Sequence, residues 1–348
     1  MRWVVVLTVP LSLAAQDAYF KETPANPWLP AWELTLRADR IDEPAMRMRL
    51  VERESARIRL KWTWEAGPWS GSLGTWSALG SDSNSLNIWR YDQQPSDGTR
   101  LDAAWIQARG ATEAGFLELR LGHQENPLLA QESLWDKDLR VTGASLRAGF
   151  RSETIQELGF RGVAGRVRTL PDGKVMLAAA QVVARFDTGP VSWTAHAGHW
   201  ELRWDASDHR ERALPDGVAR ARQKLSQDVA GVGATLHVAV PLEVKTIRHR
   251  DPVSRDDGAE FQVWIGSRNR PWWPQAGYVW QRFEPRGTFH PVNGDDWWFM
   301  TNARGPRYEV ALPLPRKWLI VATYLQHHSY MAWSYPVDRR LLQVIKRF

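Results

Sequence analysis

A strict alternation of apolar and charged residues is the feature that most constrains how this chain can fold. From Ala56 to Glu65 the even positions are apolar and the odd positions are charged or polar. The stretches Trp32 to Asp39 and Leu117 to Leu121 repeat the pattern, and shorter copies follow through the rest of the chain. A period of two is typical of a β-strand with one apolar and one polar face. We therefore expect an all-β protein.

The connections between these strands alternate between short turns and long polar loops. The short turns are at 67–68, 110–115, 151–153, 188–190, 240–241, 271–274 and 313–315, and the long loops are at 40–54, 80–99, 123–139, 165–174, 205–227, 251–258, 284–305 and 328–339. Transmembrane barrels of bacteria have short periplasmic turns on one side and longer extracellular loops on the other. One strand for each interval gives about sixteen strands, an even number in the range of such barrels.

The composition agrees with strands that cross a membrane. Beyond the first residues no run of about eighteen apolar residues occurs, so a spanning helix is excluded. The mean hydropathy of −0.44 does not exclude a membrane protein, because only every second residue of a barrel strand faces lipid. The 21 tryptophans suit the membrane interface, where the ring lies in the apolar boundary and its N–H stays hydrated. A transmembrane antiparallel β-barrel is the expected fold.

The start of the chain is typical of an export signal. One basic residue, Arg2, precedes a short apolar run that ends in small residues at Ala14 and Ala15. We expect residues 1–15 to be a signal peptide and residues 16–348 to form a single barrel. The chain has no cysteine, which excludes disulfides, a lipid-anchored cysteine and thiolate metal sites.

Soluble β-folds are the alternative to a barrel. A propeller would show a repeat of about forty residues, and no such repeat is found. A sandwich would not require long and short connections to alternate. One local irregularity lies between Val191 and Trp204, where the apolar phase moves by one residue near Gly198 and His199. This shift predicts a β-bulge.

Two segments carry a family resemblance. The amphipathic end from Leu342 to Phe348 resembles the assembly signal of outer-membrane barrels, although Lys346 stands where an apolar residue is usual. The segments Leu119 to Pro127 and Trp135 to Gly143 resemble the outer-membrane porin family of Gram-negative bacteria. The resemblance implies an outer-membrane location, recognition of Phe348 by the barrel-assembly machinery, and a possible homotrimer.

If the apolar faces meet lipid, the polar faces line a lumen. A barrel of about sixteen strands is wide enough to hold a water-filled channel. Arg57, Arg59 and Lys61 occupy successive inward positions of one strand and could form a basic ladder. The full set of expected pore-lining residues is Arg37, Arg57, Arg59, Lys61, Arg120, Arg147, Arg161, Arg185 and Arg203.

The third long loop, residues 123–139, is the expected constriction. In porins the loop at this position commonly folds inward and narrows the pore, so the resemblance implies the same role here. Its acidic residues are Glu125, Glu132, Asp136 and Asp138. Charged rings at a constriction set ion preference. The net charge of +6 favours a weak preference for anions.

The sequence therefore predicts an outer-membrane porin for passive diffusion of small hydrophilic solutes, in contact with membrane lipid and lipopolysaccharide. An alternative is a specific channel or exporter for sugars or an acidic polysaccharide, because Trp297, Trp298 and Phe299 could stack on sugars or lie at the interface. A barrel enzyme is less favoured, since none of the nine histidines falls in a recognised motif. We expect no enzymatic activity, no cofactor, no metal site and no nucleic-acid partner.

Overall fold

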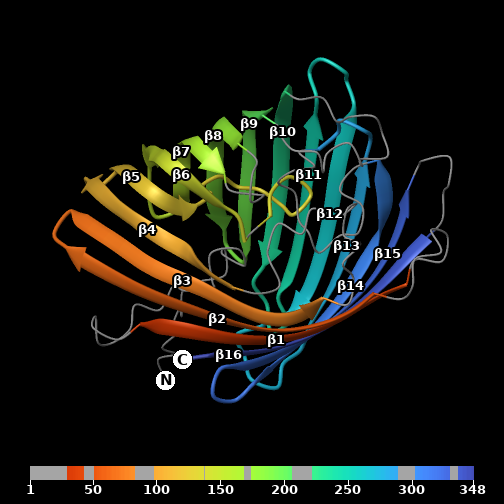
Figure 1. The fold of residues 1–348 in the computed structure, drawn as a ribbon. Helices are drawn as coiled ribbons and strands as arrows, with labels where there is room; N and C mark the ends of the chain where they lie inside the picture. Colours follow the sequence, from red (N-terminus) through yellow and green to blue (C-terminus); the bar gives the residue numbers. More distant parts are fainter. Residues whose placement is uncertain are drawn as a thin grey trace.

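The computed structural model describes residues 30–42, 51–82, 98–136, 138–167, 174–205, 222–288, 302–329 and 336–348. They form a closed barrel of sixteen antiparallel strands, in which every strand pairs with its neighbours in sequence and β1 pairs with β16 (Figure 1). The strands are β1 Ala31–Asp42, β2 Val51–Ala66, β3 Trp69–Asp82, β4 Gly98–Ala111, β5 Gly115–Glu125, β6 Arg140–Phe150, β7 Ile155–Val167, β8 Lys174–Thr188, β9 Val191–Asp205, β10 Arg222–Leu236, β11 Leu242–Arg250, β12 Asp257–Gly266, β13 Gln275–Phe283, β14 Ala303–Leu314, β15 Trp318–Ser329 and β16 Pro336–Arg347. The predicted fold class and strand number are confirmed. Within these residues, none of the chain forms a helix of sufficient length and apolarity to span a bilayer.

The two faces of the sheet follow the alternation in the sequence. Leu36 lies opposite Ala56, and Thr35 lies opposite Arg57, so apolar residues share one face and polar residues share the other. Leu36, Ile58 and Leu119 are exposed on the outer face. In hydrocarbon every backbone N–H and C=O needs a partner within the protein, and a closed sheet supplies all of them. The apolar faces can therefore meet lipid without leaving a sheet edge unpaired.

Short turns and long loops follow one another in the order that the sequence predicts. All the short connections are at one end of the barrel, and the long ones are at the other. Two of the short turns contain a glycine with positive φ, Gly67 (φ 58°) and Gly189 (φ 63°), a conformation that glycine adopts without the cost that a side chain would add. We call these two ends the short-turn end and the long-loop end.

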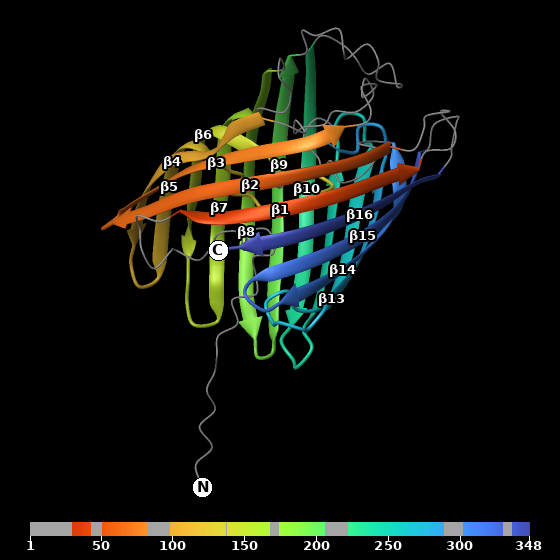
Figure 2. The ribbon, with the colours of Figure 1, turned by 60° about the horizontal axis from the view of Figure 1, so that its bottom comes forward.

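The barrel closes where β1 meets β16, side by side in Figure 2. On the inner face Arg339 donates two hydrogen bonds to the carboxylate of Asp39, at 2.9 and 2.7 Å. At the short-turn end the N–H of Phe348 donates to the carbonyl of Trp32 at 3.0 Å, and the two rings stack. The unusual Lys346 points outward, with its ammonium 5.3 Å from the centre of the Trp318 ring, so aromatic rings accommodate its charge.

Strand β9 corrects one expectation. It pairs with β8 and β10 without any shift in register, so the predicted bulge near Gly198 is wrong. The alternation continues unchanged, which points Trp200 and Leu202 into the barrel, where both are fully buried. The apolar phase moves in the sequence because the inner face of this strand becomes apolar toward the long-loop end. Register shifts occur instead in β3–β4 at Gly74 and in β7–β8 at Ile155.

Replacing Val182 by arginine tests the assignment of the outer face. Val182 lies near the middle of β8 and is 59% exposed. An arginine at the bilayer midplane costs about 2–4 kcal/mol, and one near the interface costs about 0–1 kcal/mol. We expect Val182→Arg to lower the free energy of unfolding in lipid vesicles by the larger amount, measured by urea titration. Met176→Arg, on the same face nearer the long loops, is the control, and equal losses from both would contradict the assignment.

Candidate functional site

Most of the predicted pore-lining residues point into the barrel. Arg37, Arg57, Arg59, Lys61, Arg120, Arg147, Arg161 and Arg185 all lie on the inner face by register. Arg203 does not, which corrects the prediction for this residue. It lies on the outer face of β9, its side chain is 72% exposed, and it contacts Glu201 at 2.8 Å. The error follows from the bulge that β9 does not have.

The described residues of the connection between β5 and β6, which are 126–136, 138 and 139, lie inside the barrel. Its apolar side chains Leu134 and Trp135 are 0% and 4% exposed. They belong to one buried cluster with inward residues of β6 to β11: Leu128, Ala130, Leu134, Trp135, Leu139, Val141, Val163, Val167, Val175, Leu177, Ala179, Trp200, Leu202, Leu225, Val229 and Ile247. The yellow trace of this segment runs within the ring of strands (Figure 1). We call residues 126–139 the inward loop.

Wall side chains also hold the backbone of the inward loop. The amide of Gln181 donates to the carbonyl of Leu129 at 3.0 Å and accepts from its N–H at 2.8 Å. Arg161 donates to the carbonyl of Pro127 at 2.8 Å. The N–H of Ser133 donates to Glu260 at 2.8 Å. These bonds come from β7, β8 and β12, so the loop is fixed along its length and not only at its ends.

Carboxylates of this segment face bases on the wall. Asp138 contacts Arg59 and lies 3.9 Å from Arg57. Glu125, the last residue of β5, lies 3.5 Å from Lys61, so all three members of the predicted basic ladder face an acidic partner.

The two remaining acidic residues of the loop have different partners. Glu132 contacts Arg307 on β14, across the barrel from β6. Asp136 accepts a hydrogen bond from the N–H of Asp138 at 2.7 Å and so fixes the local turn. The four predicted acidic residues are thus brought to the interior.

A second charged group lies on β6 to β8. Arg147 stands directly opposite Arg161, an arrangement that is unfavourable for like charges unless an anion lies between them. Glu157 supplies it, at 3.3 Å from Arg147, 2.6 Å from Arg161 and 3.8 Å from Arg185. One carboxylate thus serves three guanidinium groups.

Several interior residues of importance were not predicted as site residues. Arg140 forms an ion pair with the carboxylate of Asp102 at 2.9 Å beside the loop, and Arg307 anchors Glu132. Arg307 lies in the polar phase of an alternating stretch, so its inward position could have been found from the sequence. The position of Arg140 is set by the loop itself, and no pattern signals it.

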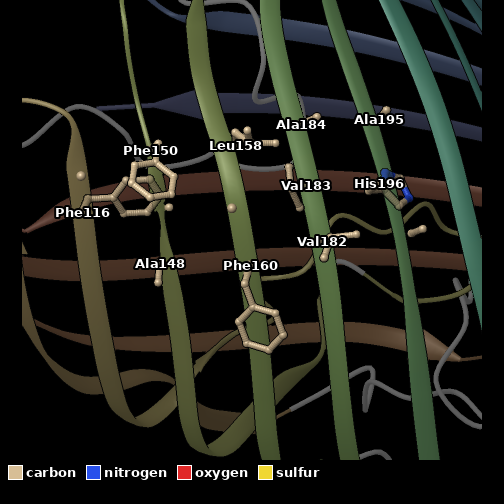
Figure 3. Close-up of a pocket in the computed structure, with 14 residues that line it drawn as sticks. Phe116, Ala148, Phe150, Leu158, Phe160, Val182, Val183, Ala184, Ala195 and His196 are labelled. Atoms are coloured by element: carbon tan, nitrogen blue, oxygen red, sulfur yellow. The ribbon is translucent and has the colours of Figure 1, made fainter.

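An apolar hollow of about 900 Å³ lies on β5 to β9 (Figure 3). Phe150, Leu158, Phe160 and Val182 on its walls are exposed and share the outer, apolar face. A site for a hydrophilic solute is therefore not expected there. Within the described ranges, no three or more His, Asp or Glu side chains come together in a group that could hold a metal ion. The residues Trp297 to Phe299 lie outside these ranges.

The fold of the barrel is similar to that of solved bacterial porins. OprB of Pseudomonas putida in its high-pH structure superposes with a TM-score of 0.61 at 10% identity, covering 92% of this chain and 94% of that one. The low-pH structure of the same protein gives a TM-score of 0.50 at 12% identity, covering 91% of each chain. OmpF of Salmonella typhi, in complex with daunomycin, gives 0.53 at 10% identity, covering 91% of this chain and 97% of that one.

Neither a protein-family model nor a curated protein sequence matches the chain. The similarity therefore concerns the fold, which is that of an outer-membrane porin. The chain is a closed sixteen-stranded barrel of this type with a loop packed inside it.

Shortening Leu134 tests whether the apolar cluster holds the inward loop. A buried leucine replaced by alanine costs about 2–5 kcal/mol. We expect Leu134→Ala to increase protease cleavage and hydrogen exchange in residues 126–139 while the strands remain protected. Leu129→Ala, at a half-buried position of the same loop, is the control. Protection of the loop that is unchanged by Leu134→Ala would show that polar anchors alone hold it.

Proposed function

We propose that this protein is an outer-membrane channel for passive diffusion of small hydrophilic solutes, with a weak preference for anions, and that it is not an enzyme. The observation that carries the proposal is the inward loop, whose carboxylates face basic side chains on the opposite wall. A loop fixed across the interior narrows any aqueous path that runs through a barrel of this fold.

The interior is suited to water and not to lipid. Charged side chains on the inner face of β1 and β2 are paired but not sealed, since Arg57 is 17% and Arg59 is 11% exposed. Charged groups need solvent or close partners to avoid a large desolvation cost. A narrow hydrated passage beside the ladder supplies the solvent, and the loop carboxylates supply the close partners.

The balance of charge supports the preference for anions. In the ladder, Arg57 and Arg59 share Asp138. On β6 to β8, three arginines share Glu157, and one of them, Arg147, also contacts Glu118 at 3.1 Å. In each group guanidinium outnumbers carboxylate, and charged rings at a narrow point select ions of the opposite sign.

The remaining parts of the proposal concern export and assembly. We propose that residues 1–15, which lie outside the described residues, are a signal peptide removed on export. We also propose that the last strand, β16, and Phe348, which follows it, are recognised by the barrel-assembly machinery. The barrel would contact membrane lipid and lipopolysaccharide in the outer membrane of a Gram-negative bacterium, with a homotrimer as the proposed assembly.

Conductance of the purified protein in planar lipid bilayers tests the channel. We expect stepwise conductance in potassium chloride and a reversal potential displaced weakly toward the anion. A very small conductance that one sugar blocks would favour a substrate-specific channel. Insertion without any conductance would contradict the proposal.

Reversing the charge of the basic ladder tests its place in the path. We expect Arg57→Glu, Arg59→Glu and Lys61→Glu together to shift the reversal potential toward cations, because carboxylates then line the narrow part. The matched control is Arg203→Glu, Arg248→Glu and Arg282→Glu, three exposed residues on the outer face. A shift of equal size in the control would place the effect outside the lumen.

A further inference from the structure

We propose that three arginine–aromatic stacks form a path for small organic oxyanions, with a carboxylate or phosphate group, down one wall of the lumen. The stacks lie on the inner face from β3 to the turn after β6. This inference rests on the proposed channel and adds to it a route and a class of solute.

The first stack lies nearest the long loops. Arg100 of β4 stands directly opposite Trp76 of β3, and its guanidinium carbon is 3.8 Å from the centre of the indole ring. The Arg57 guanidinium lies 5.4 Å from the same ring. Trp76 is 1% exposed, so the arginines and not the ring meet the lumen. Among the described residues no carboxylate forms an ion pair with Arg100.

The second stack lies at mid-height, one strand further round the barrel. Arg120 of β5 lies over Trp105 of β4 at 4.0 Å, and its Nε donates to Gln107 at 2.9 Å. The residue opposite Trp105 is Gly122, with φ of +125°, and a Cβ added there would lie 2.2 Å from the carbonyl oxygen of Ala104. Glycine is therefore required at this position, and it leaves no side chain beside the stack.

The third stack lies at the short-turn end. The guanidinium of Arg151, in the turn after β6, is 4.1 Å from the centre of the Phe116 ring of β5. Arg147 approaches the same ring at 5.8 Å. The series thus descends from the long-loop end to the short-turn end and moves by one strand at each step.

The chemistry of these stacks suits oxyanions. An arginine held over an aromatic ring has fewer side-chain conformations to lose when a ligand binds its planar fork of N–H groups. The fork matches the two oxygens of a carboxylate or phosphate. Three such forks at successive heights allow an anion to leave one site for the next, which conduction requires, since binding must not be too strong.

Permeability ratios in planar bilayers test this path. The probes are potassium gluconate and potassium glucose 6-phosphate, each against potassium chloride, with the reversal potential as the readout. We expect Arg100→Gln, Arg120→Gln and Arg151→Gln together to lower the permeability of both organic anions relative to chloride by several-fold, with conductance in potassium chloride retained. A fall for one probe alone would assign the path to that oxyanion.

Two further variants test whether the permeability ratio depends on the arginine–aromatic stacks or only on positive charge in the lumen. Lys245→Gln and Arg347→Gln together remove positive charge from the interior away from the stacks, at residues that each pair with a glutamate. We expect this control to leave the ratio of organic anion to chloride unchanged. Trp105→Leu keeps every charge and removes one platform, and we expect a smaller loss of the same ratio.

The outcomes distinguish this inference from the channel itself. A normally conducting triple variant with an unchanged ratio, or a control with an equal fall, would overturn the path and leave the channel intact. A parent protein without conductance would overturn both. If the triple variant fails to assemble, as judged by heat-modifiable migration, the single substitution Arg120→Gln decides by the same ratio.

Discussion

Backbone hydrogen bonding in a medium without water is the constraint on which the rest of this structure depends. A sheet in hydrocarbon must close, since an open edge would leave unpaired N–H and C=O groups. Closure of sixteen strands creates an interior, and the alternation of side chains then assigns one row of each strand to lipid and one to that interior. The inward row has to be either hydrated or packed, and this barrel uses both solutions.

The inward loop determines which part of the inner wall is packed and which part is hydrated. On one side, apolar side chains of the loop pack against inward apolar residues of β6 to β11, where Trp200 and Leu202 are fully buried. Polar residues of the same wall, Arg161 and Gln181, bind the loop backbone. Where its carboxylates face β2 and β14, the wall carries Arg59 and Arg307. A loop that is apolar on one side and acidic on the other thus requires a wall with the complementary division. The lumen is shaped by this fit more than by the number of strands.

The fold was largely predictable from the sequence, and the site only in part. Period-two patterns such as Ala56 to Glu65, together with alternating connections, report local geometry and are readable without a structure. The inner position of Arg57 follows from the same period. Contacts such as Ser133 with Glu260 depend on which walls face each other across the barrel, and no local pattern encodes this distance. Arg203 was predicted on the wrong face because the prediction placed its apolar neighbour Leu202 against lipid. An apolar residue can face either lipid or the packed loop, and the sequence does not distinguish the two.

The seam between β1 and β16 has a consequence for how the molecule forms. Asp39 and Arg339 are separated by 300 positions in the chain, yet they form two hydrogen bonds across the seam. Pairings between distant parts of a chain slow folding, because a large loss of chain entropy precedes the contact that offsets it. Until that contact exists, the first and last ribbons each present a free edge that could recruit another chain. The slowest step of folding and the greatest risk of aggregation are therefore both expected at the seam between β1 and β16.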